Sequence, residues 1–361
     1  MSPLPYDESA ARQDPAVRFR AALIQALEDV RPVLTARFSR WQAIPRLQTS
    51  LSAFGERMDA VTSGKRARVD FKRIFARFLK DRLPDFPPGP SAGEIFRCVK
   101  PFDAKLSLLL EWNHRHAYGV GKMLELKIGA RWDSTRGGIY YPLPRFFGWG
   151  DLASWAYVTK QDLEECLNGA ADFIAILIPA LSEAIRKRMD DPAIAEGPGA
   201  ITARGAYALA RPVLDVELPG AELANVFLWY GFEERWGAPV ASDGRLRAHG
   251  AWSFQFAGPK GGGATAEVPA VGRASILTVS QIIRTQERVV EPWIDSNAAL
   301  EAVAASGGIP KEVAPTGMGI QHGKPYTDEA VWRIDYAGHA RLSRAGAMVE
   351  ISTGRVVTTW S

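Results

Sequence analysis

The chain has few cysteines and no long apolar run. Its 361 residues include two cysteines, Cys98 and Cys166, which are too few for a disulfide framework or a cysteine-rich metal site. The longest apolar stretch, around residues 173–181, contains Pro179 and reaches about half the length of a bilayer-spanning helix. The first nine residues lack the basic segment and apolar run of a signal peptide. We therefore expect a cytoplasmic protein without a membrane span.

Recognisable catalytic signatures are also missing from the sequence. No Gly-x-Ser-x-Gly elbow occurs, so a serine nucleophile finds no support. The glycine-rich segment 258–263 lacks the Lys-Ser/Thr ending of a phosphate-binding loop and is not followed by a helix. We expect this segment to be a hairpin loop, and the sequence implies no cofactor.

The composition is that of a folded protein of two or three domains. Hydrophobic residues make up 47% and charged residues 23% of the chain, which excludes wholesale disorder. The net charge of +4 is too small to imply nucleic acid, so nucleic-acid binding is open but without support. Eleven tryptophans are more than a core of this size needs, and large aromatic residues also concentrate at binding surfaces.

The first half reads as a helical lead-in followed by a sheet and a closing helix. Residues 1–14 are polar and suggest a loose leader, after which Asp14 and Pro15 begin an amphipathic helix. Alternation and turn residues predict the other elements. Helices are expected near residues 51–61, 69–83 and 162–188, and strands near 95–99, 105–112, 123–130 and 155–158.

Proline-rich and glycine-rich segments suggest the domain boundaries. Residues 84–90 stop the third helix, and residues 190–199 form the best candidate linker. The expected fold class is α+β, with antiparallel sheets each covered by helices. The expected division is a helical region at 1–90, a sheet domain at 91–190, and helix-plus-sheet modules at 200–290 and 291–361.

An internal repeat in the last third suggests that the two modules are duplicates. Each copy has a strand with a tryptophan, a second strand, and a Gly-Arg turn. The matched segments are Trp252 with Trp332, Ala266-Glu267-Val268-Pro269 with Val349-Glu350-Ile351-Ser352, and Gly272-Arg273 with Gly354-Arg355. We expect a helix before each set of strands, at 221–235 and 296–305, and buried packing positions for both tryptophans. The alternative is that two similar strands share this pattern by chance.

Two parts of the chain resemble known families. Residues 296–300, 330–336 and 349–356, with their Thr353-Gly354 turn, resemble a PepSY-like module. That resemblance implies a helix packed on a small antiparallel sheet and a binding or inhibitory role, although members of the family are commonly exported. The first half, 95–181, is similar in its order of elements to the small α+β immunity proteins that neutralise bacterial toxins.

His114 and His116 are the best candidates for chemistry. If the preceding strand continues through them, both histidines lie on one face, a spacing that can hold a metal ion or an acid/base pair. A metal site also needs a third ligand, which the local sequence does not supply. The alternative is an exposed hairpin tip.

A basic helix is the first candidate surface for a partner. Residues 65–82 contain eight Lys or Arg and two Asp, and the apolar positions of the helix fall on one side. The cations Lys72, Arg73, Arg77 and Lys80 could therefore meet an acidic protein or phosphates. A solvated helix face is the plainer interpretation.

An aromatic segment, 132–151, is the second candidate surface. It is too aromatic for disorder, and Arg136, Arg145 and Trp149 have the composition of a protein-binding hot spot. Alternatively, the aromatic side chains fold back and cap the sheet.

Three classes of function remain open at this point. The preferred one is a non-catalytic binding or inhibitory protein, for example an immunity protein that neutralises a toxin by occluding its surface. The others are a metal-dependent hydrolase or nuclease that uses His114 and His116, and a structural scaffold. The partner expected in the first case is another protein, and the oligomeric state is open.

Overall fold

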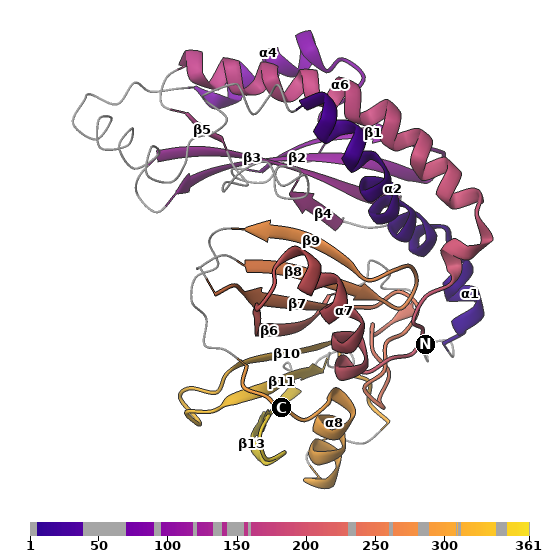
Figure 1. Ribbon diagram of the computed structural model, residues 1–361, viewed down its shortest axis with the longest axis vertical. Coiled ribbons are helices and arrows are strands. Elements are labelled where there is room, and N and C mark those ends of the chain that lie inside the picture. The colour runs from indigo at the N-terminus through magenta and orange to yellow at the C-terminus, as the bar shows by residue number, and fades with distance from the viewer. Residues whose placement is uncertain are drawn as a thin grey trace. The chain divides into compact units, whose positions relative to one another are not determined.

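The computed structural model is an α+β protein with two antiparallel sheets (Figure 1). It describes residues 6–38, 70–89, 95–117, 121–132, 139–142, 155–157, 160–229, 236–259, 263–280, 289–307, 309, 312–336 and 345–360. These fall into two compact units. We call Ala22–Asp190 the sheet unit, and Met1–Ala21 together with Asp191–Ser361 the repeat unit.

The sheet unit is built from a sheet and the helices that pack on it. Its strands are β1 (Ile95–Pro101), β2 (Leu106–Ala117), β3 (Gly121–Trp132), β4 (Ile139–Pro142) and β5 (Trp155–Tyr157). They pair in the order β1-β2-β3-β4, and β5 pairs with β3. Helices α4 (Phe71–Arg82) and α6 (Lys160–Asp190) pack against each other, as Figure 1 also shows. Most of helix α2 (Pro15–Phe38) belongs to this unit as well.

Helix α6 is much longer than its most apolar stretch suggests. By length and composition, its segment Leu163–Asp190 is the candidate membrane span in the described part of the chain. Its apolar stripe is nevertheless packed inside the protein, since Leu167, Phe173 and Leu177 are almost fully buried.

The repeat unit contains one eight-stranded sheet made by two copies of the same motif. In each copy a helix precedes four strands that pair in chain order. The first copy is α7 (Ala203–Glu217) with β6 (Glu222–Trp229), β7 (Ala251–Ala257), β8 (Gly263–Pro269) and β9 (Ser275–Ser280). The second is α8 (Ser296–Ala305) with β10 (Gly317–His322), β11 (Ala330–Tyr336), β12 (Ala345–Glu350) and β13 (Val356–Trp360). The order β13-β12-β11-β10-β6-β7-β8-β9 joins them through β6 and β10.

The strand register reveals an internal two-fold relation between the copies. Trp252 on β7 pairs with Leu228 on β6, and Trp332 on β11 pairs with Ile320 on β10. Leu228 and Ile320 are therefore equivalent positions, and so are the residues that precede them, Phe227 and Gly319. These two residues pair with each other across the antiparallel β6–β10 junction. The pseudo-two-fold axis therefore passes through this pair, as it must when equivalent residues face each other.

The second strands of the two copies align differently from the sequence match. Trp252 pairs with Val268 and Trp332 pairs with Val349, so these two valines are equivalent. The sequence match equates Val268 with Ile351, which is two residues further along. Because side chains alternate across a strand, a shift of two leaves the faces unchanged and escapes a pattern-based alignment.

The predicted helix at 221–235 is wrong over the described residues. Residues 222–229 form strand β6, and the helix of the first copy is α7, which begins eighteen residues earlier than predicted (221 − 203). Thr202 caps α7 by accepting from the Gly205 N–H, and Gly220 follows the helix with a φ of 72°. The helix predicted at 296–305 matches α8, and the predicted region 51–61 lies outside the described residues.

Over its described residues, 6–14, the polar N-terminal segment is not a loose leader. Residues 8–13 form helix α1 (Glu8–Gln13), which Asp7 caps. The Tyr6 hydroxyl accepts from the Ala248 N–H at 2.7 Å and donates to Glu8. Arg20 forms a buried ion pair with Glu267 on β8. These contacts attach the segment to the C-terminal repeats.

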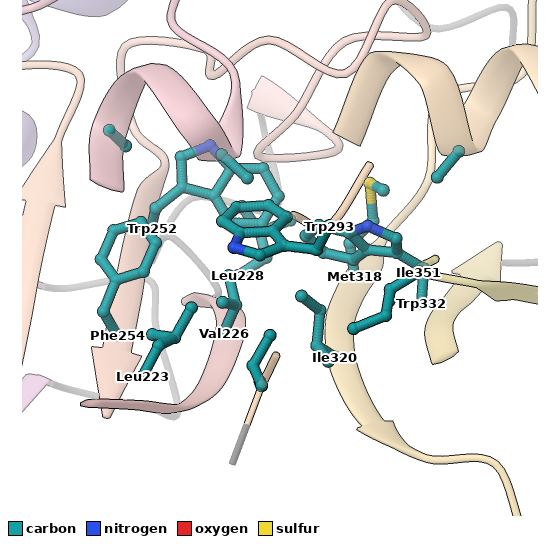
Figure 2. Packing of buried hydrophobic residues seen from close by; sticks show 14 of the residues in the cluster. Leu223, Val226, Leu228, Trp252, Phe254, Trp293, Met318, Ile320, Trp332 and Ile351 are labelled. Atoms are coloured by element: carbon teal, nitrogen blue, oxygen red, sulfur yellow. The ribbon is translucent and has the colours of Figure 1, made fainter. Parts of the chain in front are cut away.

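Tryptophans occupy the centre of the repeat unit's core, as expected (Figure 2). Trp252, Trp293 and Trp332 are at most 1% exposed. The Trp332 indole N–H donates to the Ile294 carbonyl at 2.9 Å. These tryptophans hold the framework together and are unavailable to a partner.

Candidate functional site

The candidate site is the outer face of helix α4, and the sequence of that helix explains how the face is formed. Asp70 caps the helix by accepting from the Arg73 N–H at 3.2 Å. The apolar residues recur at three- and four-residue spacing, which aligns them along one side. The buried positions are Phe71, Ile74, Phe75, Phe78 and Leu79. The cations must then occupy the opposite side, as the sequence predicts.

The buried side of α4 is fixed by aromatic contacts to the sheet. The rings of Phe75 and Phe78 each lie 5.6 Å from Trp112 on β2, in edge-on geometry. Phe71 and Phe75 also contact Phe96 on β1. Such contacts add to the free energy of simple burial. The helix is thereby held at a fixed rotation, and its outer face is a permanent surface.

The cations of α4 divide into two groups. Arg77 pairs with Glu164 on α6, and Arg82 reaches Asp172 at 2.5 Å and Asn168 at 2.8 Å. These arginines contribute to the packing of α4 on α6.

The second group points to solvent. Lys72, Arg73 and Lys80 are exposed, and their side chains form no ion pair with the residues that the structure describes. Asp70, which lies next to Lys72 and Arg73 in the sequence, is used as the helix cap. The outer face of α4 therefore carries three cations that remain available, and of Lys72, Arg73, Arg77 and Lys80 only Arg77 is engaged within the unit.

A shallow cavity of about 290 Å³ lies between α4 and α6. Apolar Ile74, Phe78 and Leu167 form part of its lining. Its charged lining includes Arg77 and Arg82, which are already paired across the two helices. The cavity lies beside the charged surface, and both of its arginines are already paired with α6.

The two candidate metal ligands lie on strand β2. The strand continues through His114 and His116, which pair with Leu124 and Lys122 on β3. The side chains of both histidines are outside the described residues. Within the part of the chain that the structure describes, no group of three His, Cys, Asp or Glu could hold a metal ion. The metal hypothesis stays a prediction.

The aromatic segment contains a strand that the sequence analysis missed. Residues 139–142 form β4, which pairs with β3 through Ile139↔Ala130 and Tyr141↔Ile128. The alternation of this short strand is hidden by the glycines before it and the prolines after it. Arg136, Arg145 and Trp149 lie outside the described residues.

Several groups with shifted pKa values are buried structural groups. Burial lowers the pKa of His249 to about 4, and its Nε2 lies 3.2 Å from the Gly237 carbonyl. Burial likewise raises the pKa of the Cys98 thiol to about 12, which suppresses the reactive thiolate. Sequence reasoning missed His249, since a single histidine between small residues gives no local signal of burial.

Comparisons with known proteins add little to this picture. No protein-family model and no curated protein matches the chain. A solved structure of a candidate lipoprotein from Clostridium difficile 630 is 8% identical with a TM-score of 0.29, and the match covers 43% of this chain and 91% of that one. The C-terminal domain of YpeB from Bacillus megaterium is 10% identical with a TM-score of 0.16, with 82% and 98% covered. At these TM-scores neither structure bears on fold or function.

Proposed function

We propose that the protein is a non-catalytic binding protein that captures an acidic protein partner on the outer face of α4. One observation carries the proposal. Lys72, Arg73 and Lys80 are exposed on a helix whose rotation is fixed by aromatic packing, while the other cations of that helix are engaged by α6.

Electrostatics favours this use of the surface. A row of like charges on a rigid helix raises the rate of encounter with an oppositely charged surface and disfavours wrong partners. Long lysine side chains lose conformational entropy when they are fixed, so the gain comes mainly from charge and falls with salt. We therefore expect a partner whose contact surface carries Asp and Glu.

The more specific proposal is that the protein inhibits its partner by occluding the partner's surface. An immunity-like protein needs a stable surface and no reactive groups, and the buried, unreactive Cys98 and neutral His249 agree with that requirement. The PepSY-like resemblance of residues 296–356 also favours a binding or inhibitory role. In this proposal the repeat unit supplies the framework, because its tryptophans are buried.

The test compares two charge-reversed variants of the full chain in affinity capture from extracts of the source cell. The first variant is Lys72→Glu, Arg73→Glu and Lys80→Glu. The control is Lys105→Glu, Lys187→Glu and Arg245→Glu, three exposed cations elsewhere on the surface. Both variants change the net charge by the same amount.

The proposal predicts a partner that the wild type and the control retain and that the α4 variant loses. The captured partner should dissociate as salt rises, because exposed charges are screened within about 8 Å at physiological ionic strength. Equal capture by both variants, or salt-independent capture, would count against the α4 surface.

A further inference from the structure

The two copies of the repeat unit are joined by a short ladder. Strands β6 and β10 pair through Val226↔Ile320 and the pair at the pseudo-two-fold axis, whereas the ladders on either side of them run along most of their strands. Beyond Val226 the bonding of β6 changes, because the Val289 N–H donates to the Leu223 carbonyl at 2.8 Å. Strands β6 and β10 therefore stop pairing with each other at this end of the junction.

A cavity of about 240 Å³, which we call the junction cavity, lies where this ladder ends. Its lining includes the next residue along each strand, Asn225 on β6 and Gln321 on β10. Ile320 and Gln321 are neighbours on one strand, so their side chains lie on opposite faces of the sheet, yet both line the cavity. The cavity therefore opens between the two strands, and it has room for about eight groups of the size of a water molecule.

The lining of the junction cavity is apolar inside and carries amide groups at its mouth. Its apolar residues Ala224, Val289 and Ile320 are buried. Asn225 is half-buried and Gln321 is exposed. Apart from His322, the lining residues that the structure describes are uncharged. A charged ligand would lose hydration here without gaining an opposite charge, so the lining favours a neutral ligand that is partly apolar.

The two amide side chains have hydrogen-bonding capacity to spare. The Asn225 Nδ2 donates to the Gln255 Oε1 at 3.3 Å, and its Oδ1 accepts from none of the described residues. The Gln321 side chain forms no hydrogen bond with the described part of the chain, so it offers both a donor and an acceptor. A trans secondary amide carries its N–H and C=O on opposite sides. It can therefore donate to Asn225 on one strand and accept from Gln321 on the other, as a rung of an antiparallel sheet does.

The opposite end of the junction provides an internal comparison. Asn225 and Gly317 each lie two residues before the pair at the pseudo-two-fold axis, and Gln321 and Trp229 each lie two residues after it. The axis therefore makes Gly317 equivalent to Asn225 and Trp229 equivalent to Gln321. Since the same framework accepts glycine and tryptophan at these positions, the two amide groups are not required by the fold of the motif.

We propose that the junction cavity binds a small neutral ligand that contains a secondary amide and a small aliphatic group. The aliphatic group contacts Val289 and Ile320 inside the cavity, and the amide bridges Asn225 and Gln321 at its mouth. A ligand of about ten non-hydrogen atoms gains little free energy, so the expected dissociation constant is on the order of millimolar.

A titration followed by methyl NMR of the full chain, labelled in its Ile, Val and Ala methyl groups, tests the proposal. The ligand used is N-acetyl-alanine N-methylamide, which is neutral and carries secondary amides and a methyl group. Saturable shifts are expected at the methyl groups of Val289, Ile320 and Ala330, which line the cavity. Acetate and methylammonium carry a methyl group and a charge, and each should bind at least about tenfold more weakly.

Two substitutions distinguish the junction cavity from other places on the surface. Ala330→Leu fills the cavity and Gln321→Leu removes an amide from its mouth, so each should weaken binding by at least about tenfold. Thr359→Leu, the same kind of change at an exposed position of β13, is the matched control for Gln321→Leu and should leave binding unchanged. Circular dichroism checks that each variant keeps its fold.

Three results would overturn the proposal. The first is the absence of saturable shifts up to about 100 mM ligand, or shifts confined to methyl groups away from the cavity. The second is an affinity for acetate or methylammonium equal to that for the neutral amide. The third is equal affinity of the wild type and Gln321→Leu, which would show that the amide at the mouth takes no part in binding.

Discussion

The rings of Trp252 and Trp332 lie 5.9 Å apart in edge-on geometry. The two residues are equivalent positions of the two α-β₄ copies, and both are fully buried. Their contact near the pseudo-two-fold axis joins the hydrophobic centres of both copies into one core. The two copies are therefore coupled parts of one folding unit.

The two equivalent tryptophans differ in their hydrogen bonding, which predicts unequal effects on stability. The Trp332 N–H donates to Ile294, whereas the Trp252 N–H has no hydrogen-bond partner in the described structure. Replacement by Phe removes the same atoms at both sites, but at Trp332 it also leaves a carbonyl without its donor. We expect Trp332→Phe to lower the free energy of unfolding by about 1 kcal/mol more than Trp252→Phe. Urea denaturation measures the difference, and equal losses would contradict the prediction.

Asp295 caps two helices at once. Its carboxylate accepts from the Ser296 N–H of α8, the Arg204 N–H of α7 and the Thr202 hydroxyl. We expect Asp295→Ala to destabilise the repeat unit by about 2 kcal/mol, against about 1 kcal/mol for a single cap. Asp7→Ala, which removes the cap of α1 alone, is the matched control. Urea or thermal unfolding measures both losses. Equal losses of unfolding free energy in the two variants would contradict the prediction.

Burial of His249 makes the stability depend on pH. Its pKa is lowered from 6.5 to about 4 in the folded protein, mainly by burial. Between these values the unfolded chain binds more protons than the folded one, so stability is lost as pH falls from 6.5 toward 4. The shift corresponds to about 3 kcal/mol across this window. His249→Gln should flatten the profile of unfolding midpoint against pH, and an unchanged slope in the variant would exclude His249 as the cause.

Local patterns in the sequence were enough to predict most of the sheet unit. The spacing of Phe71, Ile74, Phe75 and Phe78 identified the buried side of α4 because a regular helix places these residues on one face. The α+β class and the α8 helix were also confirmed. These features depend on periodicity over one element.

The features that the sequence did not predict depend on contacts between distant residues. Helix α7 was missed because Pro212 lies inside it, and a proline in a sequence usually marks the end of a helix. The merger of the two copies into one sheet depends on the Phe227–Gly319 pairing, and local alternation carries no information about partner strands. The pairing of Arg77 with Glu164 likewise joins residues 87 positions apart.

Lysine labelling in the source cell tests the account's central claim, that the outer face of α4 binds a partner. An amine-reactive reagent is applied to intact cells or fresh extract and to the purified protein, and modification of each lysine is quantified by mass spectrometry. The account predicts that Lys72 and Lys80 are protected in the cell while the exposed Lys105 and Lys187 react equally in both samples. Equal labelling of Lys72 and Lys80 in the cell and in the purified protein would contradict it.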